Sequence, residues 1–116
     1  MRRIFQLTLL VAVLGGCVDH EAKTLGLAFE GTAVPIATAR QTHTDAQVVL
    51  RGTMTEKCPV AGCWFILRDG SGTIKVDTKN AGFVVVDVPL NTSLAVAGRM
   101  LTNGTGRVIE ATGVRY

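Results

Sequence analysis

The sequence predicts a small all-β domain built from five strands, and three observations support this prediction. Apolar and polar residues alternate with the two-residue period of a half-buried strand, most clearly from Val48 to Glu56. Glycine-rich turns separate alternating segments at Asp69–Gly72 and at Asn103–Gly106. The segment Thr78 to Thr92, between the two hairpins, is poor in helix-forming residues, so we expect a short or absent helix there.

The strands follow one another as two hairpins after a first long strand. Trp64–Asp69 and Thr73–Asp77 flank the first glycine-rich turn, and Leu94–Met100 and Arg107–Tyr116 flank the second. In the last strand the inward residues Ile109 and Ala111 fall out of step with Val114. We therefore expect a β-bulge near Gly113.

The region before the first strand allows two interpretations. Pro35 is well placed to open a short helix from Ile36 to Arg40, because proline suits the first helical position. A weak additional strand around Leu27 to Phe29 is an equally open alternative.

The first sixteen residues have the layout of a secretory signal. Arg2 and Arg3 precede an apolar run from Leu7 to Leu14, and two small residues follow before Cys17. This run is much shorter than the roughly 20 residues that a bilayer-spanning helix needs. The sequence therefore predicts a cleaved signal peptide at 1–16 rather than a transmembrane anchor.

Net charge argues against a nucleic-acid-binding protein. The chain has 12 lysines and arginines against 9 aspartates and glutamates. Arg2 and Arg3 leave with the signal, so the mature chain has 10 against 9 and a net charge of +1. A charge this small provides no electrostatic footprint for phosphate backbones.

Cys58 and Cys63 flank a four-residue connection. The role expected for this pair depends on the cellular compartment of the protein. Outside the cytoplasm a nearby pair is most often a disulfide. If the two residues face each other across the hairpin, their Cα atoms lie about 4.5 to 5.5 Å apart, within the range that a disulfide tolerates. We expect a structural bond.

Two other uses of the cysteines stay open. Cys58, Cys63 and Met54 are candidates for a soft-metal site, because thiolate and thioether ligands suit Cu(I), but this site requires a reduced pair. Thiol–disulfide exchange is less favoured, because four residues separate the cysteines and no helix N-terminus is apparent to lower a thiol pKa.

The sequence offers few candidates for catalysis. The two histidines are His20, in the segment after the signal, and His43, in a polar loop. Ser71 lies in a turn and Ser93 at a strand edge, and neither has the setting of a nucleophile. Asp69 is expected to support its own turn by hydrogen-bonding the backbone. We expect no enzymatic activity and no cofactor.

Leu14-Gly15-Gly16-Cys17 resembles the lipobox of bacterial lipoproteins, apart from glycine where alanine or serine is commoner. The resemblance implies cleavage before Cys17, acylation of Cys17 and attachment to a membrane. Residues 17–33 are then the acylated cysteine and a tether, and residues 34–116 are the domain. Val18, in place of aspartate, resembles lipoproteins sent to the outer membrane, which implies its periplasmic face.

The stretch Val49 to Asp77 resembles the pattern of OB folds. Gly52 stands in the first strand, and Phe65-Ile66-Leu67-Arg68-Asp69-Gly70-Ser71-Gly72-Thr73-Ile74 forms the hairpin. Residues 34–116 also resemble a family of small uncharacterised bacterial periplasmic or lipoprotein domains, through the element Cys58-Pro59-Val60-Ala61-Gly62-Cys63-Trp64. Both resemblances imply an OB-like barrel, and the second has no known function to transfer.

The OB-like barrel suggests a ligand face. Trp64, Arg68 and Lys75 lie on or near the second and third strands, the face that OB folds commonly use. An envelope protein or a polysaccharide is the expected partner. Two alternatives remain: Trp64 packs beside the cysteine pair instead of contacting a ligand, or the face binds single-stranded nucleic acid by stacking.

Overall fold

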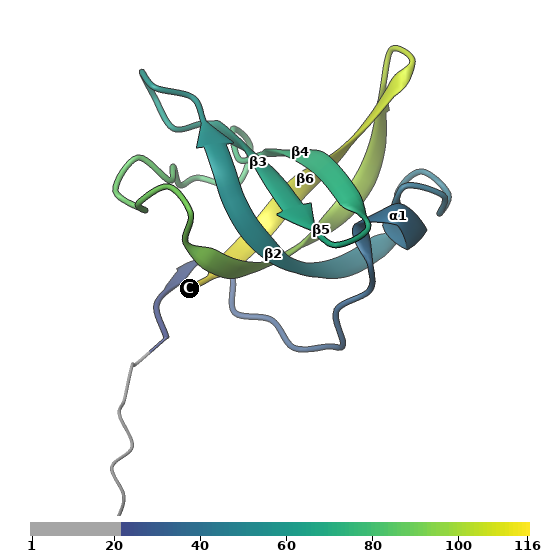
Figure 1. Cartoon of the computed structure of the whole chain (residues 1–116), viewed down its shortest axis with the longest axis horizontal. Coiled ribbons are helices and arrows are strands. Elements are labelled where there is room, and N and C mark those ends of the chain that lie inside the picture. Colours follow the sequence, from purple (N-terminus) through teal and green to yellow (C-terminus); the bar gives the residue numbers. More distant parts are fainter. Residues whose placement is uncertain (1–21) are drawn as a thin grey trace, which may run out of the picture.

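A computed structural model describes residues 22–116, which form a sheet curled into a closed barrel with one short helix (Figure 1). The signal peptide, Cys17 and residues 18–21 of the predicted tether lie outside the described residues. The elements, in chain order, are β1 (Thr24–Gly26), α1 (Ile36–Ala39), β2 (Gln47–Lys57), β3 (Trp64–Asp69), β4 (Gly72–Asp77), β5 (Ser93–Asn103) and β6 (Gly106–Arg115).

Five strands, β2 to β6, close the barrel. The order along the sheet is β1-β6-β4-β3-β2-β5, and β5 also pairs with β6. Every pairing is antiparallel except β4 with β6, where Lys75 pairs with Val108 and Asp77 with Glu110 in parallel register. The predicted all-β, five-stranded barrel is confirmed, and β1 is a short addition at its edge.

Alternation along the strands fills the barrel interior. On β2, Leu50 and Met54 are fully buried, whereas Arg51 between them is exposed. Each large apolar side chain that is fully buried contributes about 1.5–3 kcal/mol. The fully or nearly fully buried core consists of Ile36, Ala39, Leu50, Met54, Phe65, Leu67, Ile74, Val76, Val85, Val88, Leu94, Val96, Met100, Ile109, Ala111 and Val114.

A β-bulge interrupts the pairing of β5 with β6. Ala97 pairs with Gly113, but Gly98 pairs with Ala111, so Thr112 is the extra residue. The bulge returns Val114 to the core side after Ala111, which confirms the expected irregularity near Gly113.

The segment before the barrel differs from the expected tether, because part of it pairs with the barrel. The additional strand covers Thr24–Gly26 rather than Leu27 to Phe29, and Leu25 pairs with Val114 of β6. Pairing ends after Gly26, whose positive φ of 76° turns the chain away. Residues 24–33 therefore lie along the barrel instead of extending from it.

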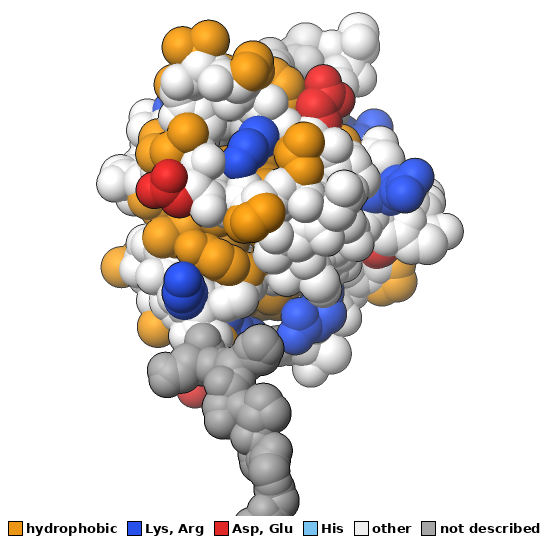
Figure 2. Space-filling model, turned by 60° about the vertical axis from the view of Figure 1, so that its left-hand side comes forward, with side chains coloured by type: hydrophobic (Ala, Val, Ile, Leu, Met, Phe, Trp, Pro, Cys, Tyr) orange, Lys and Arg blue, Asp and Glu red, His pale blue; other side chains and the backbone are white. Residues whose placement is uncertain are grey.

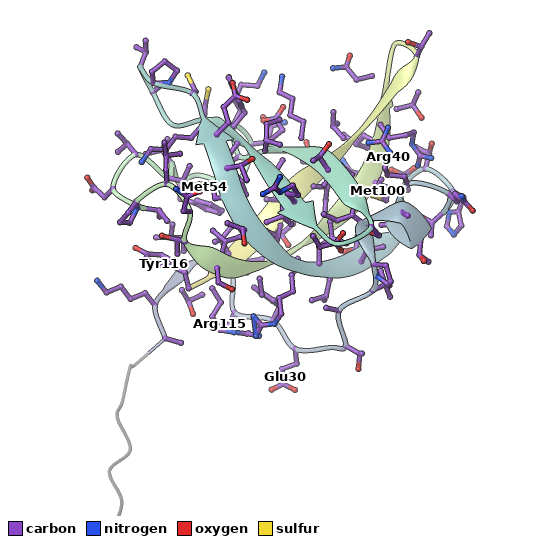
Figure 3. All side chains as sticks on the ribbon, viewed as in Figure 1. Glu30, Arg40, Met54, Met100, Arg115 and Tyr116 are labelled. Carbon is purple, nitrogen blue, oxygen red and sulfur yellow. The ribbon has the colours of Figure 1, made fainter. Side chains whose placement is uncertain are left out.

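Arg115 holds this segment in place. Its Nη1 donates to the carbonyl of Phe29 at 2.9 Å, and its guanidinium lies 4.5 Å from the centre of the Phe29 ring. Figure 3 shows Arg115 beside the part of the chain that carries Glu30. Neither contact is visible in the sequence, because the two partners are 86 residues apart.

Asp69 joins its own turn to helix α1. Its Oδ1 accepts from the backbone N–H of Ser71 at 2.7 Å and of Gly72 at 3.1 Å, which confirms its expected role in the turn. Its Oδ2 accepts from the N–H of Ile36 at 3.0 Å, and Ser71 Oγ accepts from the N–H of Ala37 at 2.9 Å. The β3–β4 turn thus caps the predicted short helix, which is present at Ile36–Ala39.

No helix forms between β4 and β5, as predicted from the sequence. Turns fill residues 78–92, and Lys57 of β2 holds this loop. Lys57 Nζ donates to the carbonyls of Val86 at 2.9 Å and of Val88. The Lys57 ammonium group holds the loop backbone in one conformation through these hydrogen bonds. In a helix, hydrogen bonds within the backbone would do this.

Replacing Lys57 with methionine should loosen the 78–92 loop. Methionine keeps the apolar stem and loses the charge-assisted hydrogen bonds, which are worth about 1.5–3 kcal/mol. We expect faster proteolysis near Val86, a site exposed at the surface, and a lower free energy of unfolding by about 1.5 kcal/mol. Lys79→Met is the control, because Lys79 is exposed and makes only a 3.7 Å ion pair with Asp77. Equal effects of the two substitutions would contradict the role given to Lys57.

Candidate functional site

The outer surface of β2, β3 and β4 carries the predicted ligand residues. We call it the outer face and define it by Arg51, Thr53, Trp64, Ile66, Arg68, Thr73 and Lys75. On β3, Phe65 and Leu67 point into the core, so the residues that alternate with them point outward. The same alternation places Lys75 outward between the buried Ile74 and Val76.

Strand register arranges these residues in rows. Arg68 pairs with Thr53 of β2 on one side and with Thr73 of β4 on the other. The next row pairs Ile66 with Lys75, and the row after that pairs Trp64 with Asp77. The three residues named from the sequence, Trp64, Arg68 and Lys75, therefore share one face.

Cations slightly outnumber carboxylates on this side of the barrel, because Arg51, Arg68 and Lys75 share it with Glu56, which pairs with Ile66, and Asp77, which pairs with Trp64. Among the described residues, no carboxylate forms an ion pair with Arg51, Arg68 or Lys75. Arg40 adds a further cation at the edge, because its Nη1 donates to the carbonyl of Thr73 at 3.2 Å. Arg51 was not among the predicted ligand residues, although its place between Leu50 and Gly52 in the alternation indicates that it points outward.

Trp64 is partly exposed on the outer face, and its contact with a ligand stays a prediction. Its ring is half-buried, and Lys75 Nζ lies 5.3 Å from the ring centre, within the range of a cation–π interaction. Part of the ring is thus used in packing against a neighbouring side chain. The exposed part remains on the outer face.

The cysteine loop, residues 58–63, adjoins this face. The Cys58 N–H donates to the Trp64 carbonyl at 3.0 Å, so the hydrogen bond links Cys58 to Trp64 instead of to Cys63. Both cysteines are half-buried and carry free thiols in this structure. The disulfide therefore stays a prediction.

The loop also changes the acidity of Cys58. The backbone N–H groups of Ala61 and Val60 favour the thiolate, burial opposes them, and the N–H groups of Gly62 and Cys63 add smaller contributions. Together they lower the pKa of Cys58 from 9.0 to about 7. No helix terminus is apparent in the sequence near Cys58, and the backbone of the loop lowers the pKa instead.

An apolar surface lies next to the cysteine loop. The Val85 N–H donates to the Gly62 carbonyl at 2.9 Å, which brings the 78–92 loop against it. Val60 is 87% exposed at the tip of one loop, and Val84, Val86 and Leu90 are exposed on the other. Figure 2 shows hydrophobic side chains gathered on this side of the molecule.

The remaining candidates do not join a common site. Met54 is fully buried in the core, whereas Cys58 and Cys63 lie in the loop. His43 is exposed, with its Nδ1 3.0 Å from the Thr44 carbonyl oxygen. Within residues 22–116, no three or more His, Cys, Asp or Glu side chains come together in a way that suits a metal ion.

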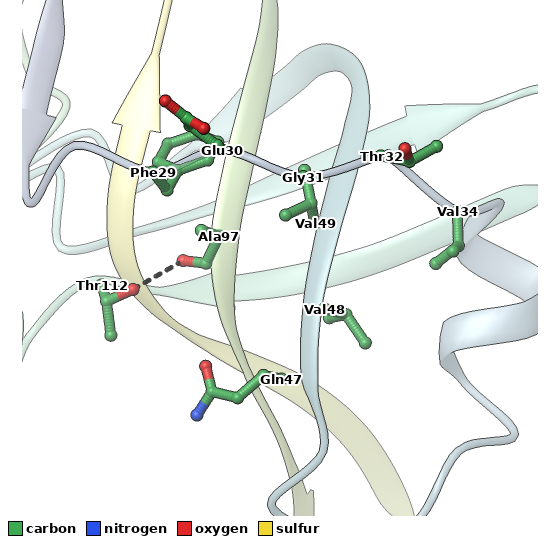
Figure 4. A pocket seen from close by; sticks show the side chains of 10 residues that line it. All are labelled: Phe29, Glu30, Gly31, Thr32, Val34, Gln47, Val48, Val49, Ala97 and Thr112. Carbon is green, nitrogen blue, oxygen red and sulfur yellow. Dashed lines mark hydrogen bonds between the residues drawn. The ribbon is translucent and has the colours of Figure 1, made fainter.

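A shallow hollow of about 430 Å³ lies between the 29–34 segment and the barrel (Figure 4). Its lining is mostly apolar, with Phe29, Val34 and Val49 among the contributors. Thr112 lies at one side, where its Oγ1 donates to the Ala97 carbonyl at 3.2 Å. The hollow could not be predicted from local sequence patterns, because it depends on the 29–34 segment folding back on the barrel.

No helix in residues 22–116 has the length and apolarity that crossing a bilayer requires.

Comparisons with known proteins agree with this architecture. The model of the bacterial OB fold (BOF) protein family matches residues 17–115. A solved structure described as the hypothetical protein ygiW from E. coli superposes with a TM-score of 0.59. The identity is 22%, over 73% of this chain and 89% of the other, so this likeness concerns the fold alone. No curated protein matches the chain.

Proposed function

Because this chain belongs to the bacterial OB fold family, we propose that it is a non-enzymatic binding or adaptor module of the cell envelope. It is anchored to the periplasmic side of the outer membrane by lipid on Cys17 and is stiffened by a disulfide between Cys58 and Cys63. It recognises its partner through the outer face. The partner is an envelope protein or a polysaccharide that carries anionic groups.

The observation that supports this proposal is that Arg51, Arg68 and Lys75 of the outer face form no ion pair with a carboxylate among the described residues. Cations without acidic partners in the protein are free to pair with groups on a ligand. Thr53 and Thr73 add hydroxyl groups on either side of Arg68, and these suit sugar or carboxylate oxygens. Glu56 and Asp77 lie toward the cysteine loop, so the positive end of the face is the one near Arg51 and Arg68.

Reversing two charges tests the face. We expect Arg68→Glu with Lys75→Glu to weaken binding to an anionic envelope polysaccharide at least tenfold, which corresponds to about 1.4 kcal/mol, and to reduce its salt dependence. The matched control is Lys23→Glu with Lys79→Glu, because both lysines are exposed and lie outside the outer face. Equal loss in the two double variants would contradict a specific face, and salt-sensitive binding of single-stranded DNA instead would favour the nucleic-acid alternative.

The anchor has its own test, independent of the face. Intact mass of the native protein should show a chain that begins at Cys17 and carries fatty acids. Cys17→Ser should move the protein from the membrane fraction to the soluble fraction, because no acyl chain then holds it. A chain that still begins at Met1 would remove the lipid anchor from the proposal while leaving the binding face intact.

A further inference from the structure

We propose that the domain rests on the membrane that holds its anchor, through exposed aliphatic side chains that enter the lipid headgroup layer. We call these side chains the apolar rim and define it by Leu27, Val60, Val84, Val86 and Leu90. This inference rests on the lipid anchor in the proposed function. It adds a second contact with the bilayer, which fixes the orientation of the barrel above the membrane.

The apolar rim contains every large hydrophobic side chain that is exposed in residues 22–116. The exposed fractions are 69% for Leu27, 87% for Val60, 44% for Val84, 46% for Val86 and 50% for Leu90. All five residues lie in connections between strands, and none lies within a strand. Exposed apolar side chains that gather in one region, instead of being scattered singly, mark a contact surface.

A hydrogen bond holds two of these connections together. The Val85 N–H donates to the Gly62 carbonyl at 2.9 Å, which joins the 78–92 loop to the cysteine loop. Val85 and Val88 are buried in the core, whereas the neighbouring Val84 and Val86 stay exposed. Packing of the core therefore accounts for the buried valines of the loop and leaves the exposed ones for an external partner.

The 78–92 loop adjoins the point where the chain arrives from the proposed anchor. The ring of Phe83 lies against Gly26 of β1, because a Cβ at Gly26 would be 2.6 Å from Phe83 Cε2. The end of the loop runs into β5, which begins to pair with β6 at Arg115, the residue that also pairs with Thr24 of β1. Figure 1 shows the loop and the beginning of β1 on the same side of the barrel.

The chain between the proposed anchor and the barrel is short. Lys23 exchanges two backbone hydrogen bonds with Tyr116, at 2.6 and 2.9 Å, so the chain is fixed to the barrel from this residue on. From Cys17 to Lys23 the chain advances six residues and spans at most about 20 Å. Acyl chains on Cys17 would enter the bilayer. The end of the barrel that carries β1 and the 78–92 loop therefore stays close to the lipid surface.

The chemistry of the apolar rim suits lipid better than a protein partner. Its members are valines and leucines, and it has none of the Trp, Tyr and Arg side chains that dominate protein interfaces. The carbonyls of Val86 and Val88 accept from Lys57 Nζ, so these polar groups are already paired when the loop enters a layer poor in water. Asp87 is exposed beside Val86 and must stay among the headgroups, which makes the contact shallow.

Quenching of tryptophan fluorescence in vesicles tests the inference. The full acylated protein carries Trp64→Phe, which removes its single tryptophan, and Val86→Trp as the reporter. It is purified from membranes and reconstituted into vesicles of phosphatidylethanolamine and brominated phosphatidylcholine. We expect the bromine to quench the emission of Val86→Trp, and the emission maximum to lie at a shorter wavelength than in the unfolded protein.

Thr105→Trp in the same Trp64→Phe background is the matched control. Thr105 is exposed at the tip of the β5–β6 hairpin, about 30 Å along β6 from the residues that pair with β1. In the docked orientation this tip stays in water. The bromine should therefore leave the emission of Thr105→Trp unchanged.

A single charge in the apolar rim tests its contribution to docking. Leu90→Asp, added to the Val86→Trp protein, should lower the equilibrium constant for docking about tenfold, because a carboxylate resists leaving water. Thr105→Asp in the same protein adds the same charge outside the rim and should leave the quenching unchanged. Circular dichroism establishes that each variant is folded.

The outcomes separate this inference from the anchor. Intact mass of the reconstituted sample shows whether Cys17 carries fatty acids. In acylated protein, an unquenched Val86→Trp, or equal quenching of Val86→Trp and Thr105→Trp, overturns the docked orientation and leaves the anchor in place. Emission at a shorter wavelength without quenching would mean that a second copy covers the rim, which also overturns the inference. Absence of acylation overturns the anchor and the docked orientation together, but not the outer face.

Discussion

Gly98→Ala should destabilise the barrel by about 3 kcal/mol, because the added methyl group has no room between two paired strands. Gly98 lies on β5 where this strand closes the barrel against β6. A Cβ at this position would lie 2.2 Å from the Glu110 carbonyl oxygen and 2.9 Å from the Ala111 Cα. Both neighbours are backbone atoms in a paired strand, so no side chain can rotate away to make room.

The strain falls next to the bulge at Thr112, where the pairing already changes register. A typical domain has a free energy of unfolding of about 5–15 kcal/mol, so a decrease of about 3 kcal/mol is a large share of it. The same decrease lowers Tm by roughly 12–24 °C. Thermal unfolding followed by circular dichroism measures it. Gly70→Ala is the control, because nothing lies within 4 Å of its added Cβ. A Gly98→Ala protein as stable as Gly70→Ala would mean that β5 and β6 are not in close contact at this point.

Asp69→Ala should lower the free energy of unfolding by about 2 kcal/mol, because the Asp69 carboxylate hydrogen-bonds both the β3–β4 turn and helix α1. It removes the acceptors for the Ser71, Gly72 and Ile36 N–H groups together. Loss of an N-cap acceptor alone costs about 1 kcal/mol, and loss of the turn adds a comparable amount. Asp87→Ala is the control, because Asp87 is exposed, and we expect it to change the free energy of unfolding by less than about 0.5 kcal/mol.

The same carboxylate should make stability depend on pH. Burial raises the pKa of Asp69, but the Ser71 hydroxyl and the N–H groups of Ile36, Ser71 and Gly72 outweigh it and lower the pKa below 3.8. With the pKa lower in the folded state, the stabilisation is full above about pH 4 and is lost as the pH falls through the folded value. Urea unfolding of Asp69→Asn should show a weaker decline between pH 4 and pH 2 than the parent protein. An equal decline in both would assign the acid sensitivity to other carboxylates.

Local patterns predicted much of the fold. Alternation along β2 to β6, the glycine-rich turns and the bulge near Gly113 are all encoded within a few residues, so the sequence reveals them directly. The absence of a helix at 78–92 was also foreseeable from its composition. These features depend on short-range preferences that tertiary packing did not override.

Long-range contacts explain what sequence reasoning missed. The strand at Thr24–Gly26 exists because β6 offers it an edge, and nothing in Thr-Leu-Gly itself specifies this pairing. The outer face was predicted through Trp64, Arg68 and Lys75, whereas Arg40 joins it only because its guanidinium reaches the Thr73 carbonyl. The donors around Cys58 come from a turn whose backbone conformation a residue pattern does not display.

The edge position of β1 has a mechanical consequence for the lipid anchor that we propose at Cys17. None of residues 24–33 is fully buried, and the buried core begins at Ile36. A pull applied from the N-terminal side would unzip β1 from β6 before it loaded the closed barrel. Detaching these ten residues from the barrel would add about 35 Å, at full extension, to the segment between Cys17 and the barrel. The barrel could then move farther from the proposed anchor while its interior stayed folded.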